Sequence, residues 1–156
     1  MKVQNFSPRP EHDHAKVLRL CRFVERCVRP GADCNLKLDS QWKRRSLTVG
    51  ITQLNPENPQ QVDVMIWMSF GASYPRSTMH VPETGKIVLN SWEEEFVLVL
   101  AHEARHILHF RHFIDVMTPE EMEIDAEFSA LEVLEKFRKN QSRRAPMTQN
   151  DSLHAG

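Results

Sequence analysis

The segment that follows Ser91 constrains the fold of this chain most, because a long stretch of it contains no residue that ends a helix. Ser91 suits an N-cap, and Glu94 three residues later completes a capping box. Residues 96–101 are all apolar, which fits either a buried helix or a strand. The capping box favours the helix, and neither glycine nor proline follows before Pro119. The sequence therefore predicts a largely buried helix over residues 92–112.

Within this predicted helix lies the string His102-Glu103-Ala104-Arg105-His106. Residues one helical turn apart share a face, so both imidazoles can point at one ion while Glu103 leans toward the same space. Zinc suits such a site because it takes nitrogen and oxygen ligands in a tetrahedral arrangement. A catalytic zinc site also leaves its fourth position for a water molecule. The string therefore indicates a zinc site with His102 and His106 as ligands.

A second helix is predicted from Pro119, with Thr118 as N-cap and Glu121 completing another capping box. Its apolar residues form one stripe: Met122, Ala126, Ala130, Val133, Leu134 and Phe137. Glu123 falls within this stripe, where a carboxylate costs several kcal/mol unless it is paired, hydrogen-bonded or metal-bound. The two histidines give it a partner, so Glu123 is the expected third ligand. Glu127, one turn later, is placed to accept the other ring N–H of a ligand histidine.

Two other histidines are alternative third ligands. His112 stands where the metzincin pattern His-Glu-x-x-His-x-x-Gly-x-x-His has its last histidine. That pattern needs its glycine, because the helix must break there, and this chain has His109 at that position. On an unbroken helix His112 lies away from the paired histidines, whereas His109 lies near them. Glu123 is favoured over both.

The segment Glu123-Ile124-Asp125-Ala126-Glu127 resembles the Glu-x-x-Ala-Asp/Asn segment of the gluzincin metallopeptidases. In size the chain resembles the minigluzincin group, which includes the small cytosolic ImmA/IrrE-type peptidases, over roughly residues 76–138. The resemblance implies a zincin-like domain that hydrolyses peptide bonds of a protein or peptide substrate. It implies that Zn²⁺ is the cofactor and that His102, His106 and Glu123 hold it.

The same resemblance implies that Glu103 is the general base, which takes a proton from the activated water and passes it to the leaving amine. It places Glu127 behind a ligand histidine, where relatives more often carry Asp or Asn. Arg105 stands where many relatives have a small residue. An edge strand within residues 77–90 is expected to pair with an extended substrate. Three nearby residues can stabilise an oxyanion, although a surface role is favoured for each: Tyr74, Arg76 and His80.

The remaining segments predict an α+β domain in which an N-terminal helix and an antiparallel sheet precede the two site helices. Residues 1–11 are expected to be an extended arm and residues 12–29 a helix. Alternating apolar residues predict strands at 47–54, 62–70, 77–81 and 86–90, joined by a loop at 55–61 and a hairpin turn at 82–85. Residues 1–140 then form a single domain, and the polar residues 141–156 a disordered tail.

The overall charge of the chain gives no sign of a nucleic-acid or membrane partner. The formal net charge is −1 over 156 residues, of which 40% are hydrophobic, and this fits one folded core. Basic residues do recur at Arg19, Arg22, Arg26 and Arg29, and again at Lys43-Arg44-Arg45. A solvated face explains them best, with a phosphate-binding face as the alternative. Nucleic acid is therefore a weakly supported partner.

The cysteines and the first residues favour a cytoplasmic protein. Cys21, Cys27 and Cys34 lack the Cys-x-x-Cys spacing of a zinc knuckle or redox pair, and their odd number argues against a disulfide framework. Residues 1–8 contain no apolar signal-peptide core, and no window approaches the ~18 apolar residues of a membrane span. We expect reduced thiols and a cytoplasmic location.

Two other functions are compatible with the same residues. The histidines of a buried helix can be hydrogen-bonded in the core without any metal. A metal can also stabilise a binding or regulatory module that has no turnover, because the sequence indicates ligands more clearly than catalysis. Metal content distinguishes the first alternative from a zinc peptidase, and hydrolysis of an unfolded protein distinguishes the second.

Overall fold

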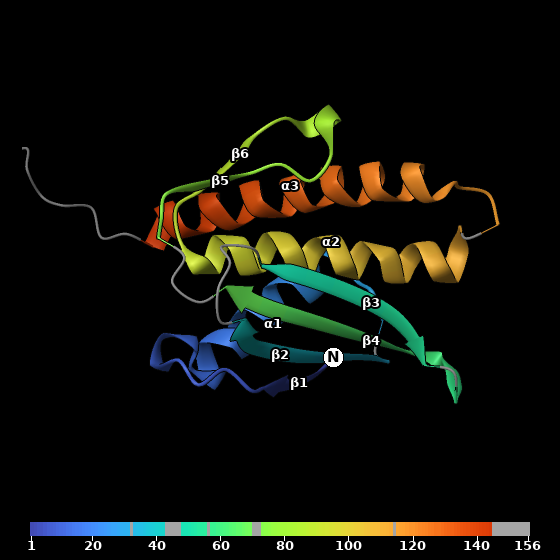
Figure 1. Ribbon diagram of the computed structural model, residues 1–156, viewed down its shortest axis with the longest axis horizontal. Coiled ribbons are helices and arrows are strands. Elements are labelled where there is room, and N and C mark those ends of the chain that lie inside the picture. The colour runs from blue at the N-terminus through green and yellow to red at the C-terminus, as the bar shows by residue number, and fades with distance from the viewer. Residues whose placement is uncertain (32, 43–47, 56, 70–72, 114, 145–156) are drawn as a thin grey trace, which may run out of the picture.

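The protein has an α+β fold in the computed structural model, which confirms the class predicted from the sequence (Figure 1). The structure describes residues 1–31, 33–42, 48–55, 57–69, 73–113 and 115–144. A four-stranded sheet has the order β1-β2-β4-β3, and β5 and β6 form a second small sheet. The strands are β1 (Lys2–Asn5), β2 (Cys34–Trp42), β3 (Val49–Asn55), β4 (Asn58–Ser69), β5 (Arg76–Thr78) and β6 (Ile87–Leu89).

The described part of the chain forms three α-helices, of which the second and third begin where the capping boxes predict. They are α1 (His14–Val28), α2 (Trp92–His112) and α3 (Pro119–Arg144), with short 3-10 helices η1 (Pro10–His12) and η2 (Pro82–Thr84). At the start of α2, Ser91 accepts a hydrogen bond from the backbone N–H of Glu94 at 3.2 Å. At the start of α3, Thr118 and Glu121 each accept the other's backbone N–H. No described helix is long and apolar enough to cross a membrane.

Helix α2 is the centre of the fold. It lies between the four-stranded sheet and α3, and it also contacts α1 (Figure 1). Phe96, Leu100 and Ile107 of α2 are completely buried, and Leu36 and Val64 of the sheet are buried in the same core. The prediction of a helix buried on most sides is therefore confirmed.

The main sheet is mixed, which corrects the prediction of an antiparallel one. Strands β3 and β4 are antiparallel, but β4 pairs in parallel with β2, and β2 in parallel with β1. Neither β1 nor β2 is predicted from the sequence. β1 has a single apolar residue, Val3, and within residues 34–38 of β2 the buried side chains are Cys34, Leu36 and Leu38. Whether such a short segment becomes a strand depends on the strands it pairs with. In a parallel pair these partners are always distant in the sequence, because parallel strands need a long connection.

Several predicted boundaries of strands and turns are wrong. Asn58 already belongs to β4, so much of the loop predicted over residues 55–61 is strand. The 3-10 helix η2 replaces the hairpin turn predicted over residues 82–85, and β5 ends at Thr78 rather than Val81. Proline at the start of a 3-10 turn presets its φ angle, which favours η2 over a tight turn.

The C-terminal helix is longer than predicted. α3 continues to Arg144, so residues 141–144, which the sequence predicts as part of a disordered tail, are helical. Residues 145–156 lie outside the described part of the chain, as does the basic string Lys43-Arg44-Arg45.

Candidate metal centre

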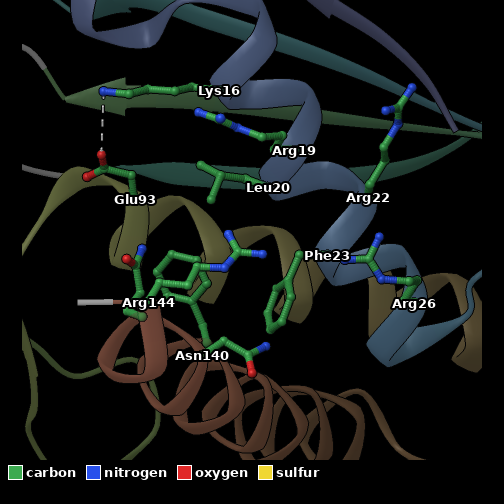
Figure 2. A pocket seen from close by; sticks show the side chains of 11 residues that line it. Lys16, Arg19, Leu20, Arg22, Phe23, Arg26, Glu93, Asn140 and Arg144 are labelled. Carbon is green, nitrogen blue, oxygen red and sulfur yellow. Dashed lines mark ion pairs between the residues drawn. The ribbon is translucent and has the colours of Figure 1, made fainter. Parts of the chain in front are cut away.

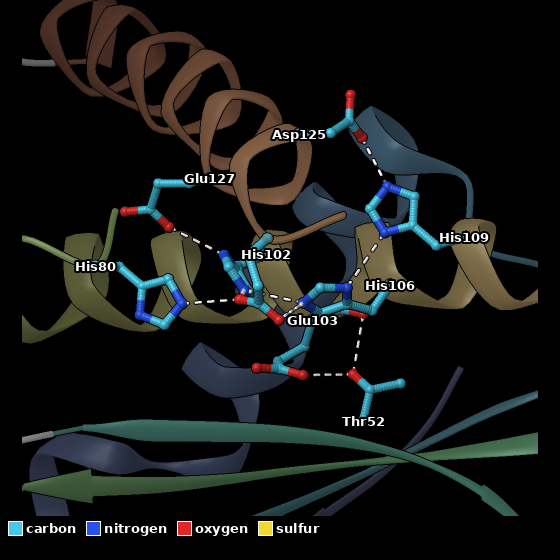
Figure 3. A network of polar contacts seen from close by, with 9 residues as sticks. Thr52, His80, His102, Glu103, His106, His109, Asp125 and Glu127 are labelled. Carbon is cyan, nitrogen blue, oxygen red and sulfur yellow. Dashed lines mark hydrogen bonds and ion pairs between the residues drawn. The ribbon is translucent and has the colours of Figure 1, made fainter. Parts of the chain in front are cut away.

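The three residues predicted as zinc ligands meet between α2 and α3. One helical turn on α2 brings His102 and His106 together, and their Nε2 atoms are 3.0 Å apart (Figure 3). Glu123, in the first turns of α3, places Oε2 at 3.2 Å from the Nε2 of His102 and Oε1 at 3.3 Å from the Nε2 of His106. The three side chains therefore form a compact triangle of donor atoms.

The size of this triangle fits a zinc ion. Zinc bonds nitrogen and oxygen at about 2.0–2.2 Å with tetrahedral angles, so its donor atoms lie about 3.3 Å apart. The separations of 3.0, 3.2 and 3.3 Å are close to that value. Two imidazoles and one carboxylate are also the donor set of one class of catalytic zinc site. The Glu123 side chain is 44% exposed and that of His102 only 9%, so the triangle opens to solvent on the Glu123 side.

Glu127 orients the first histidine, as the sequence predicts. Its Oε2 lies 2.9 Å from Nδ1 of His102, and its side chain is 3% exposed (Figure 3). An ionised carboxylate can only accept, so Nδ1 of His102 carries the hydrogen and Nε2 keeps its lone pair for a metal. The second oxygen of Glu127 has no partner among the described residues.

His109 orients the second histidine, a contact that the sequence does not predict. Nε2 of the completely buried His109 lies 2.7 Å from Asp125, and its Nδ1 lies 3.2 Å from Nδ1 of His106. Asp125 also accepts a 2.6 Å hydrogen bond from Arg105. Because His109 donates to Asp125, it accepts at Nδ1 the hydrogen of His106, which leaves Nε2 of His106 as a lone-pair donor. His109 thus lies behind the triangle, and the exposed His112 is at the end of α2.

The protonation of the triangle suits a cation. Burial and the adjacent ring of His102 lower the pKa of His106 to about 4. Burial opposes ionisation of Glu123, but its contacts with His80 and the two paired histidines hold its pKa below the ordinary value. Burial alone would lower the pKa of His102, whereas the hydrogen bond to Glu127 raises it. The triangle is therefore an anionic carboxylate with at least one neutral imidazole, and a metal ion would compete with the proton of His102.

Glu103 lies beside the triangle and points toward strand β3. Its Oε2 accepts a hydrogen bond of 2.5 Å from Thr52, whose hydroxyl also lies 3.1 Å from the backbone oxygen of Glu103 (Figure 3). Burial raises the pKa of Glu103 above the ordinary glutamate value, although the Thr52 hydrogen bond opposes this. Gly50 of the same strand gives the side chain room, because a Cβ there would lie 2.5 Å from Cγ of Glu103.

The sheet edge beside the site is β3, the last strand in the order of the main sheet. An edge strand was expected within residues 77–90, and Thr78 of β5 does line the space next to Glu103. Hydrogen bonding to Glu103 nevertheless comes from Thr52 of β3. The difference arises because the position of β3 in the sheet depends on β1 and β2, which the sequence pattern leaves unpredicted.

His80 lies at the open side of the triangle, in the segment between β5 and η2. Its Nε2 is 2.9 Å from Oε2 of Glu123, and its ring meets that of His102 edge-on with centroids 4.8 Å apart (Figure 3). Ligand atoms of His80, His102 and Glu123 all lie within 4.8 Å of one another. The sequence favours an ordinary surface role for His80, and its side chain is indeed 54% exposed. No local spacing reveals this contact, because it joins segments distant in the chain.

The other two oxyanion candidates are engaged elsewhere. Tyr74 donates its hydroxyl hydrogen to Glu95, and Nη2 of Arg76 lies 3.2 Å from the second oxygen of the same carboxylate. The pKa of Tyr74 is strongly raised, mainly by burial and to a lesser extent by the hydrogen bond to Glu95. Of the three candidates, His80 alone contacts a residue of the triangle in the described part of the chain.

Two hollows flank His102 and Glu103. One, of about 270 Å³, lies toward β5, and the other, of about 520 Å³, lies toward the start of α3. Apolar side chains line both: Val49, Met79 and Leu98 in the first, and Ile51, Phe110 and Met122 in the second. An extended chain that crosses the site can therefore place a side chain on each side of Glu103.

Comparison with known proteins does not identify the family. No protein-family model, no curated protein and no solved structure matches the chain. The chemistry of the site is therefore argued from the geometry of its own residues.

Proposed function

We propose that this protein is a zinc-dependent peptidase of the gluzincin type. One observation carries the proposal: two glutamates approach the same pair of histidines in different ways. Glu123 shares the donor triangle, whereas Glu103 is buried beside it and held by Thr52. A site that only binds metal has no need of the second glutamate, but hydrolysis needs a base next to the metal.

The residues of the triangle would hold the zinc ion. When bound, zinc supplies Lewis acidity, which acidifies a water molecule and polarises the scissile carbonyl. Glu103 accepts a proton from the attacking water and delivers it to the leaving nitrogen, so the carbon–nitrogen bond breaks as a neutral amine leaves. The raised pKa of Glu103 suits both transfers, because a base with a pKa nearer neutrality is also a better acid.

Two further residues support this reaction. Thr52 fixes the rotamer of Glu103, since its hydroxyl is tied to both the carboxylate and the backbone of that residue. His80 reaches the open side of the triangle, where an N–H donor stabilises the negative charge that develops on the carbonyl oxygen.

The substrate of this proposal is an extended peptide. Among the described strands β3 is the edge of the main sheet, and its outer side offers backbone N–H and C=O groups to a pairing strand. The two apolar hollows favour apolar side chains on both sides of the cleaved bond. Three free thiols, Cys21, Cys27 and Cys34, favour a reducing compartment, so the proposal includes the cytoplasm as the site of action.

A metal-stabilised binding module without turnover is the second candidate, and His80 is the observation that favours it. A structural zinc site has four protein ligands, and His80 lies where it can join His102 and Glu123 as a further ligand. In that arrangement no position remains for water.

The replacement of Glu103 by glutamine tests the proposal. Glu103→Gln keeps the size of the side chain and removes the base, so about one zinc per chain should remain bound while hydrolysis of casein falls by about 10² to 10⁴-fold. His80→Ala is the companion variant: it should keep zinc and lose activity. If the Gln variant cleaves casein as fast as the wild type, Glu103 is not the base. If the wild type cleaves nothing and His80→Ala releases zinc, the binding module is correct.

A further inference from the structure

A groove rich in basic residues lies between α1 and the C-terminal end of α3 (Figure 2). It has a volume of about 510 Å³, and a hollow of about 370 Å³ adjoins it, sharing Phe23, Arg26 and Asn140. We call the two together the basic groove. Its cationic side chains are Lys16, Arg19, Arg22 and Arg26 from α1, and Lys136, Lys139, Arg143 and Arg144 from α3.

The positive charge of the basic groove is largely unneutralised. Glu93 is the acidic residue of its lining, and it lies 3.9 Å from Lys16 (Figure 2). Within the described part of the chain, the exposed Arg19, Arg22 and Arg26 form no ion pair. Although the whole chain has a formal net charge of −1, eight of its 20 Lys and Arg residues line this groove.

Aromatic rings lie in the same groove. Phe23 of α1 and Phe137 of α3 meet edge to face, with centroids 5.4 Å apart. Phe137 is buried, but Phe23 keeps part of its ring exposed between the arginines. The two rings are far apart in the sequence, so their meeting point among the cations becomes visible only in the fold. Asn140 and Gln141 add exposed amides to the rim.

We propose that the basic groove binds single-stranded nucleic acid. Guanidinium groups match phosphate oxygens with two parallel hydrogen bonds, and Arg19, Arg22 and Arg26 extend over about 10 Å along α1, enough for successive phosphates. The exposed ring of Phe23 offers an apolar contact for an unpaired base. An acidic peptide would engage the cations but not the ring, and a duplex would keep its bases stacked away from it.

This site is separate from the metal centre, so the inference goes beyond the proposed peptidase function. At about 1.5 Å per residue, Glu93 at the groove lies about 14 Å from His102 along the axis of α2. None of the groove residues lines the hollows beside Glu103. A bound strand therefore leaves the cleft free, and the protein can act on peptides while it is held on nucleic acid.

The test measures binding of a fluorescein-labelled 20-nucleotide oligo(dT) by fluorescence anisotropy, from low salt upward. The affinity of the wild type should fall as the salt concentration rises. In a plot of the logarithm of the binding constant against the logarithm of the salt concentration, each phosphate contact should contribute about −0.7 to the slope. The double variant Arg22→Glu/Arg26→Glu should weaken binding at least about tenfold. The control Lys37→Glu/Lys86→Glu makes the same charge change at exposed positions outside the groove and should bind within about twofold of the wild type.

Three comparisons can overturn the proposal. Absence of oligo(dT) binding at low salt does so directly, and so does an equal loss in the groove and control variants, which would indicate net charge alone. Equal or tighter binding of a 20-residue polyglutamate or of a DNA duplex would exclude single-stranded nucleic acid as the partner. Phe23→Leu should remove the preference for oligo(dT) over duplex. All variants should have the melting temperature of the wild type. If the wild type cleaves a short peptide, the variants should cleave it at the same rate.

Discussion

Each histidine of the triangle is oriented by a different acidic residue of α3. Glu127 accepts directly from His102, and Asp125 acts on His106 through the ring of His109. When both rings are neutral, their hydrogens therefore lie on Nδ1, and both Nε2 atoms are available to bind a metal beside Glu123. A core histidine that only fills space has no need of two such chains of hydrogen bonds. At the residue scale, these polar contacts support the proposal that the site binds a metal ion.

The third ligand can be tested by exchanging it. Glu123→Ala should weaken zinc binding by more than about 100-fold, beyond the loss expected for a residue that only orients a ligand. His112→Ala should leave zinc binding unchanged, because His112 is exposed at the end of α2 and distant from the triangle. Competition with a chromophoric chelator measures both affinities. If His112→Ala loses the metal and Glu123→Ala retains it, the gluzincin arrangement is wrong.

At the scale of elements, the helices could be predicted from the sequence and the sheet only in part. A capping box is local, since its side chain bonds a backbone N–H three residues away, so Ser91 and Thr118 indicate where α2 and α3 begin. Helical spacing then predicts that His102 and His106 share one face of α2 and that Glu123 lies on the apolar face of α3. Contacts that cross between elements carry no such signal. Thr52 and His80 reach the site because β3 and the segment after β5 lie beside it.

The close approach of β3 to α2 makes Gly50 a requirement of the site. A Cβ at this position would lie 2.5 Å from Cγ and 2.6 Å from Oε1 of Glu103. Glu103 is buried on a packed helix, so its side chain must change rotamer and lose the hydrogen bond from Thr52. Gly50→Ala should therefore lower peptide hydrolysis by on the order of 10²-fold.

In the Gly50→Ala variant the zinc content should stay that of the wild type, because the atoms nearest to the added Cβ belong to Glu103 and not to a residue of the triangle. Thr52→Ser is the matched control, since it keeps the hydroxyl that holds Glu103 and should retain most of the activity. Zinc analysis and casein hydrolysis on the same preparations separate the two effects. Full activity in Gly50→Ala would mean that the position of Glu103 does not limit the reaction.

At the scale of the whole molecule, the proposed metal site joins residues from three separate parts of the fold. His102 and His106 belong to α2, Glu123 to α3, and His80 to the segment that follows β5. The basic groove lies toward the other end of α2, at Glu93. The central helix therefore links the proposed peptidase site to the proposed nucleic-acid site, and a ligand at either one is expected to stabilise the same core.

Removal of zinc should consequently lower the melting temperature of the whole domain. A ligand that binds only the folded state stabilises it by about 2.7 kcal/mol when present at 100 times its dissociation constant. For a chain of this size that corresponds to about 5–10 °C. Calorimetry with excess zinc and after EDTA dialysis should show this difference, which should shrink strongly in Glu123→Ala and persist in Lys37→Glu. Identical melting in both conditions, together with no bound zinc after reconstitution, would mean that the histidines are ordinary core residues joined by hydrogen bonds.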